Sequence, residues 1–86
     1  MKHLTIDTAQ IQDLPSIHHL FRSQLHFPSY YGNNLDALYD MLSTWDEPLM
    51  ITVILANGNQ MKQLTHLLQD ASRENPKIQL EFLQKK

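Results

Sequence analysis

The sequence contains no cysteine and only two glycines, and these shortages exclude several kinds of site. Without cysteine, no disulfide can stabilise the fold, and no thiolate is available as a nucleophile or a metal ligand. The two glycines, Gly32 and Gly58, are too few for the glycine-rich loops with which common nucleotide-binding motifs hold phosphate. The composition therefore argues against a thiol enzyme and against a nucleotide-binding protein.

Long apolar runs are also missing. No segment approaches the ~20 apolar residues that a membrane helix needs, and residues 1–7 lack the apolar run of a secretory signal peptide. We therefore expect a cytoplasmic protein that does not contact membranes. With 86 residues, the chain has room for one small domain, which we expect to span residues 1–86.

Positive charge is absent from the middle of the chain. No lysine or arginine occurs in residues 23–61, whereas Asp36, Asp40, Asp46 and Glu47 all lie there. By count, this interval carries a charge of −4, although the formal charge of the whole chain is only −2. Concentrated negative charge attracts a cationic partner and repels nucleic-acid phosphate. We expect a basic protein partner and no binding to nucleic acid.

Three segments have the composition of strands. Residues 3–6 alternate weakly between polar and apolar, and residues 78–82 alternate clearly. Between them, residues 49–55 form a nearly continuous apolar run rich in β-branched side chains. Such a run is typical of a central strand that is buried on both faces of a parallel sheet.

Three other segments have helical periodicity. The first extends from the predicted N-cap Asp13 to Leu25 and has a proline in its first turn. Asn34 is the predicted N-cap of a second helix, which Pro48 ends, and residues 61–71 form the third before Asn-Pro closes it. The order β-α-α-β-α-β predicts an α/β fold with a mostly parallel three-stranded sheet, right-handed crossovers and three, or at most four, helices.

An aromatic turn precedes the second helix. Pro28 favours an extended Phe27, and Gly32 is free to adopt a positive φ. Tyr30 and Tyr31 could both be core residues, and at least one of them should pack inward. If only one does, we expect Tyr30 to be the exposed one.

Two aspartates distinguish the second helix. Asp36 lies in its first turn, where the helix dipole favours negative charge. Asp40 lies one turn further on and repels Asp36 by about 0.2–0.5 kcal/mol. No nearby lysine or arginine compensates this repulsion, which points to a binding surface.

The carboxylates and histidines of this region allow two other kinds of chemistry. A pair of carboxylates can act as acid and base in a hydrolase, but these two lie on one helix without a pocket between them. His18, His19 and His26 lie on or just after the first helix, and their spacing fits no good metal site. We therefore expect no catalytic residues, no metal and no cofactor.

Residues 28–45 resemble the barstar family, small bacterial cytoplasmic inhibitors of barnase-type ribonucleases. The family pattern Pro-x-Tyr-Tyr-Gly-x-Asn-Leu-Asp-Ala-Leu-x-Asp is met at every fixed position. The resemblance implies a barstar-like fold and a protein that is not an enzyme. It also implies a monomer that binds one molecule of a basic, extracellular-type ribonuclease and occludes its active site.

The resemblance assigns roles to residues by position. Asp40 matches the central carboxylate that enters the phosphate pocket of the nuclease, and Tyr30 matches the aromatic that packs over its catalytic histidine. Asp70 is the weaker match to a further interface acid, and Trp45 is as well suited to a structural role. The implied partner-binding residues are Tyr30, Gly32, Asn34, Asp36, Tyr39, Asp40, Trp45 and Asp70.

The chain also departs from the reference member of the family. Tyr39 replaces a tryptophan, Met41 replaces a cysteine, and Asn33 removes an acid from the turn. The connection after Leu55 is shorter, and Pro48 lies close to a position where that member has a cis X-Pro bond.

The alternative function is an acidic interaction module of the same fold, whose basic partner is a toxin of another class or a regulatory protein.

Overall fold

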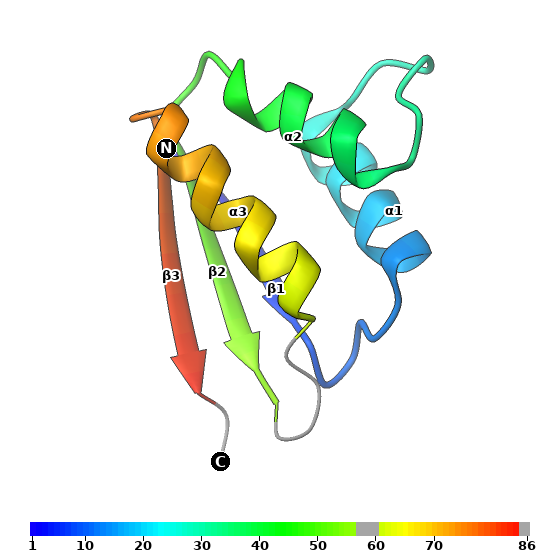
Figure 1. Ribbon diagram of the computed structural model, residues 1–86, viewed down its shortest axis with the longest axis vertical. Coiled ribbons are helices and arrows are strands. Elements are labelled where there is room, and N and C mark those ends of the chain that lie inside the picture. Colours follow the sequence, from blue (N-terminus) through cyan, green and yellow to red (C-terminus); the bar gives the residue numbers. More distant parts are fainter. Residues whose placement is uncertain (57–60, 85–86) are drawn as a thin grey trace.

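The structure is a computed structural model that describes residues 1–56 and 61–84. Its elements are β1 (Lys2–Asp7), α1 (Leu14–Leu25), α2 (Leu35–Ser43), β2 (Leu49–Leu55), α3 (Lys62–Glu74) and β3 (Ile78–Gln84) (Figure 1). The predicted order β-α-α-β-α-β is confirmed, with three helices and three parallel strands in the described ranges. The turn that the sequence predicts at residues 57–59 lies outside those ranges.

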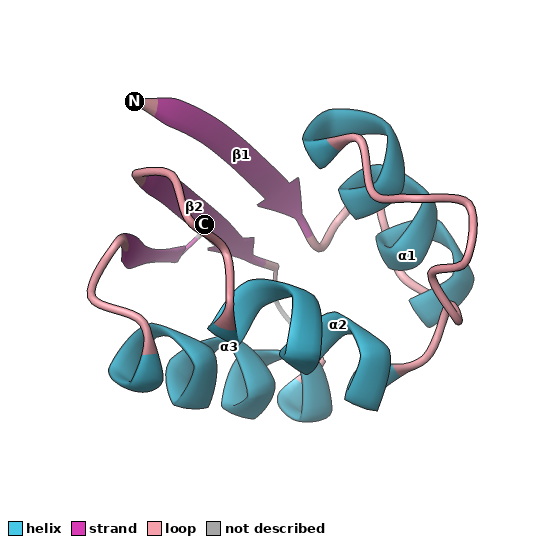
Figure 2. Cartoon of the chain, turned by 90° about the horizontal axis from the view of Figure 1, so that it is seen from above, coloured by secondary structure: helices cyan, strands magenta, loops and turns pink. Residues whose placement is uncertain are grey.

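Each strand of the sheet pairs with the strand that follows it in the chain. The order is β1-β2-β3, and the register places Leu4 opposite Ile51 and Ile51 opposite Leu80. Both connections therefore cross the sheet in the same direction. Right-handed crossovers that run in the same direction place their helices on the same face, and Figure 2 shows all three helices on one side of the sheet.

Burial along β2 follows from this one-sided arrangement. Ile51 and Val53 are buried against the helices, whereas Thr52 and Ile54, which point to the other face, are only half-buried. The prediction that this strand is buried on both faces is therefore wrong. The apolar run indicated a parallel strand correctly, but only the strand order shows that no helix in the described ranges covers the second face.

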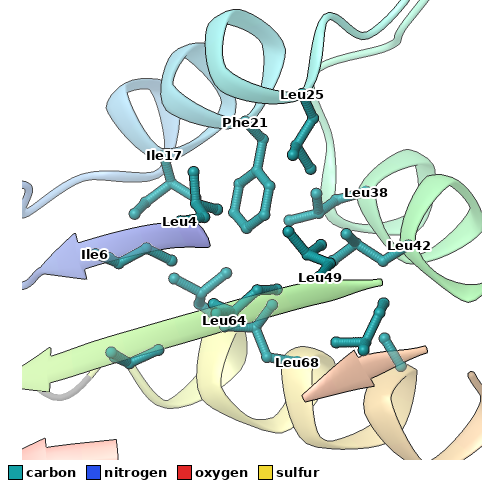
Figure 3. Close-up of a cluster of buried hydrophobic side chains, with 14 of the residues drawn as sticks. Leu4, Ile6, Ile17, Phe21, Leu25, Leu38, Leu42, Leu49, Leu64 and Leu68 are labelled. Carbon is teal, nitrogen blue, oxygen red and sulfur yellow. The ribbon is translucent and has the colours of Figure 1, made fainter. Parts of the chain in front are cut away.

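The core lies between the helices and the covered face of the sheet. Side chains from α1, α2 and α3 converge there on β1 and β2 (Figure 3). The labelled members of this cluster are Leu4, Ile6, Ile17, Phe21, Leu25, Leu38, Leu42, Leu49, Leu64 and Leu68. Because the apolar stripes of α1 and α2 face this core, their polar stripes face solvent.

Both predicted N-caps are present. The Asp13 carboxylate accepts a hydrogen bond from the Ser16 backbone N–H at 2.8 Å, and the Asn34 side-chain oxygen accepts one from the Ala37 N–H at 2.8 Å. These bonds satisfy donors that the first helical turn leaves without intrahelical partners. The starts of both helices are therefore encoded locally.

The end of α2 differs from the prediction. The helix ends at Ser43, well before Pro48, and Thr44 is its C-cap. The hydroxyls of Ser43 and Thr44 donate to the Asp40 carbonyl at 3.2 and 2.8 Å. Such side-chain bonds compete with the helical ladder. The described residues contain no cis peptide bond, so the bond before Pro48 is trans.

Asn75 joins the ends of three elements. Its buried side chain donates to the carbonyls of Leu42 at 2.9 Å and Trp45 at 2.7 Å, and its oxygen accepts from the Lys77 N–H at 3.0 Å. These bonds connect the end of α2, the end of α3 and the approach to β3. The sequence marked Asn75 only as the close of a helix.

We expect Asn75→Ala to lower the free energy of unfolding by about 2–3 kcal/mol, because it removes three hydrogen bonds and leaves the Trp45 carbonyl and the Lys77 N–H without their side-chain partner. Urea unfolding followed by circular dichroism measures this change. Gln69→Ala, at an exposed position of α3, is the control and should have little effect. A loss below about 0.5 kcal/mol for Asn75→Ala would contradict this role.

Candidate functional site

The turn between α1 and α2 directs its two tyrosines to opposite sides. The Tyr31 N–H donates to the Pro28 carbonyl at 3.0 Å, which closes the turn. Tyr30 is 83% exposed, whereas Tyr31 is only 5% exposed. The prediction that Tyr30 is exposed and its neighbour packs inward is confirmed. A large exposed aromatic at this position is available to a partner.

Tyr31 anchors the turn to α1. Its hydroxyl forms a hydrogen bond of 2.6 Å with Nδ1 of His18, and its ring meets Phe27 edge-on with a centroid separation of 4.9 Å. His18 is 4% exposed, and this burial lowers its pKa below the ordinary value. Burial raises the pKa of Tyr31 to about 12, while the positive charge of Arg22 opposes the rise. Sequence reasoning treated His18 only as a poor metal ligand and missed this bond.

The backbone of the turn uses Gly32 and Asn33 differently from the prediction. The residue with positive φ is Asn33, at 53°, and not Gly32. Asparagine tolerates this left-handed region better than most residues. Gly32 instead provides space, because a Cβ there would lie 2.9 Å from Nδ2 of Asn34, the atom that donates to the Gly32 carbonyl at 3.3 Å. Glycine thus lets the N-cap side chain fold over the turn.

The acidic residues of α2 face solvent without local partners. Asp36 and Asp40 are exposed, and neither forms an ion pair with another described residue. Four positions apart on a helix, they lie on the same face. Asp46 behaves differently: Lys77 binds its carboxylate and lowers its pKa by hydrogen bonding and charge. The exposed face of α2 therefore carries two unpaired negative charges beside the Tyr30 turn.

Asp70 lies on α3, the helix that packs beside α2 (Figure 1). It is exposed and forms an ion pair with Arg73 on its own helix. A nearby cation already balances this charge, which distinguishes Asp70 from the acids of α2. Its role as a partner contact stays a prediction.

Tyr39 and Trp45 are half-buried and pack against the core. Trp45 follows the end of α2, and its ring lies 6.1 Å from that of Phe27, centroid to centroid. The indole N–H is buried and has no hydrogen-bond partner among the described residues. This placement gives Trp45 a structural role whether or not its edge also contacts a partner.

An open groove of about 610 Å³ separates α1 from the start of α2. Leu14, His18 and Arg22, at successive four-residue steps, form one wall together with Pro15, and residues 33–36 form the other. We call this feature the α1–α2 groove. Sequence reasoning missed it, although the four-residue spacing does place the three α1 side chains on one face.

Among residues 1–56 and 61–84, no three histidine, aspartate or glutamate side chains are grouped so that they could hold a metal ion. Within the same ranges, every helix is too short or too polar to span a membrane. What the site presents is exposed acid, an exposed aromatic ring and a groove.

Two comparisons with known proteins bear on this surface. Residues 1–84 match the model of the family described as Barstar (barnase inhibitor). The chain is also similar to a Bacillus subtilis protein named "Putative ribonuclease inhibitor YrdF". The two sequences are 32% identical over 82 residues, which cover 86% of this chain and 89% of the relative.

The buried His18 predicts a pH dependence of stability. Its folded-state pKa lies below the ordinary 6.5, so the unfolded chain takes up this proton at higher pH than the folded chain does. The free energy of unfolding should therefore fall as the pH drops from about 6.5 toward the folded-state pKa. Urea unfolding at about pH 7.5 and about pH 5.5 measures this loss.

His18→Asn, which keeps a polar atom near the position of Nδ1, should reduce the difference in stability between the two pH values. His19→Asn is the matched control, because His19 is exposed on the same helix, and it should keep the wild-type difference. Identical pH dependence in wild type and His18→Asn would contradict the assignment.

Proposed function

The chain belongs to the barstar family, and we propose that it is a cytoplasmic inhibitor of a barnase-type ribonuclease. As a monomer it binds one molecule of a basic, extracellular-type nuclease and covers its active site. The exposed face of α2 and the turn that carries Tyr30 form the contact. The protein is not itself an enzyme.

One observation carries this proposal: Asp36 and Asp40 are exposed and unpaired on one helix face within a stretch that lacks lysine and arginine. Like charges one turn apart repel each other by about 0.2–0.5 kcal/mol. No cationic side chain of the described fold forms an ion pair with either carboxylate. A cationic partner that pairs with both carboxylates compensates this repulsion.

The chemistry of ribonucleases supplies such a partner. Their active sites hold cationic groups that bind phosphate and stabilise the charge of the transition state. A carboxylate pairs with those groups through charge-assisted and often bidentate hydrogen bonds. Asp40 therefore occupies the position of a substrate phosphate, and Asp36 binds beside it. The inhibitor blocks cleavage because RNA cannot enter.

The turn supports this mode of binding through its rigidity. Tyr30 is held outward because Tyr31, its neighbour, is bonded to His18 inside the protein. A turn whose backbone is already held in place loses little conformational entropy on binding. In the proposed complex, Tyr30 packs on the catalytic histidine of the nuclease. Gly32, Asn34, Tyr39, Trp45 and Asp70 complete the proposed contact surface.

The first test is calorimetric titration of this protein with a barnase-type ribonuclease, with RNA cleavage followed in parallel. One-to-one binding that abolishes cleavage supports the proposal. If no binding occurs, the partner is a different basic protein, such as a toxin of another class, and capture from the native cell extract becomes the way to identify it.

Asp40→Ala should weaken binding by about 3–5 kcal/mol, because it leaves cations of the nuclease buried without a partner. This corresponds to an increase in Kd on the order of 10²- to 10⁴-fold. The matched control is Glu81→Ala, which removes the same charge from β3 at an exposed position that pairs with Thr52, on the face without helices. If both variants bound equally well, or if Asp40→Ala failed to fold, the role of Asp40 would be wrong.

Association should slow as salt rises. Exposed charges are screened beyond ~8–10 Å at physiological ionic strength, so long-range attraction between α2 and the nuclease weakens. We expect the association rate constant in stopped-flow experiments to fall by roughly tenfold or more between low and high salt. The dissociation rate constant should change much less. An association rate that does not respond to salt would exclude electrostatic steering.

A further inference from the structure

The α1–α2 groove contains a positive charge beside an acidic surface. Arg22 is the only lysine or arginine on α1, and its exposed side chain lines the groove opposite Asp36. Among the described residues, its guanidinium forms no ion pair or hydrogen bond. Arg22 is therefore free to bind a group from outside.

The groove is continuous with the proposed contact surface. Asn34 and Asp36 belong to both, since they line the groove and also lie on the N-terminal end of α2. In the proposed complex, a nuclease that docks on these shared residues lies over the groove. Its surface then comes close to Arg22 and removes water from the guanidinium.

The position of Arg22 limits which chemical groups of a partner can enter the α1–α2 groove. A guanidinium covered without an acceptor costs free energy, because its donors lose their hydrogen bonds to water. A carboxylate matches the fork of guanidinium donors in charge and shape. Leu14 and Leu35 provide half-buried apolar walls for the stem of such a side chain. The volume of about 610 Å³ is ample for one side chain.

We propose that the α1–α2 groove receives an acidic side chain of the ribonuclease partner and that Arg22 is its ionic partner. This inference rests on the proposed function. The contact surface then has two parts of opposite sign: acids on α2 for the cations of the nuclease, and a cation on α1 for an acid next to them. Because Asp36 also lines the groove and repels a carboxylate, the incoming acid must lie on the α1 side, beside Arg22, and this requirement restricts the orientation of the complex.

The direction in which Kd changes when Arg22 loses its charge tests this proposal. If the partner were simply cationic, removing a positive charge from the inhibitor would strengthen binding by reducing repulsion. The groove proposal requires the opposite result at Arg22. Binding of a barnase-type ribonuclease should be compared by calorimetry for wild type, Arg22→Gln, Arg22→Glu and Lys62→Gln. Lys62 is an exposed cation at the start of α3, outside both the groove and α2.

We expect Arg22→Gln to raise Kd by roughly tenfold, the scale of a lost hydrogen bond between charged groups. Arg22→Glu should raise it further, and Lys62→Gln should leave it unchanged or lower it. Unfolding curves of the four proteins establish that all are folded. Arg22→Gln is the decisive variant, because glutamate in the last turn of α1 also opposes the helix dipole.

The outcomes separate the two proposals. Tight binding by wild type with equal or tighter binding by Arg22→Gln overturns the groove assignment and leaves the proposed function intact. Equal weakening by Arg22→Gln and Lys62→Gln also overturns it, because the effect would then depend on net charge alone. Absence of binding by wild type overturns the proposed function, and the groove assignment with it.

Discussion

The strand order constrains the whole molecule. Because β1, β2 and β3 are adjacent in sequence order and parallel, both crossovers run in the same direction, and right-handedness places α1, α2 and α3 on one face. Each helix must then cover the same core with its apolar stripe and leave its polar stripe to solvent. The exposed position of the acids on α2 follows from this arrangement.

A second requirement is that the turn before α2 be held in one conformation. The hydrogen bond between Tyr31 and His18 ties the turn to α1, and the Asn34 cap fixes where the next helix begins. One tyrosine is used for anchoring, so that its neighbour Tyr30 can stand outside the core. The rigidity of the exposed surface thus depends on buried polar contacts that never meet a partner.

Charge is distributed in two ways across the fold. Asp46 and Asp70 have cationic partners that balance their charge, whereas Asp36 and Asp40 have none among the described residues. Arg22 is likewise unpaired in the groove that lies against Asp36. Unpaired charges add little to the stability of a fold, and they keep their full capacity to bind an external partner. Their concentration around α2 is the observation on which the proposed function rests.

The sequence by itself determined the order of elements, both helix N-caps and the acidic stretch, because periodicity, capping and charge are local properties that can be read from neighbouring residues. It also predicted Tyr30 as the exposed member of its pair. It placed the end of α2 wrongly, because the hydroxyls of Ser43 and Thr44 compete for the Asp40 carbonyl. It also offered Gly32 for the positive φ of the turn, which Asn33 adopts instead.

Only the tertiary structure decided which face of the sheet stays uncovered, that Asn75 joins three elements, that His18 anchors the turn, and that Arg22 lies across a groove from Asp36. Each of these depends on contacts between segments far apart in the chain, and local patterns do not encode such distances.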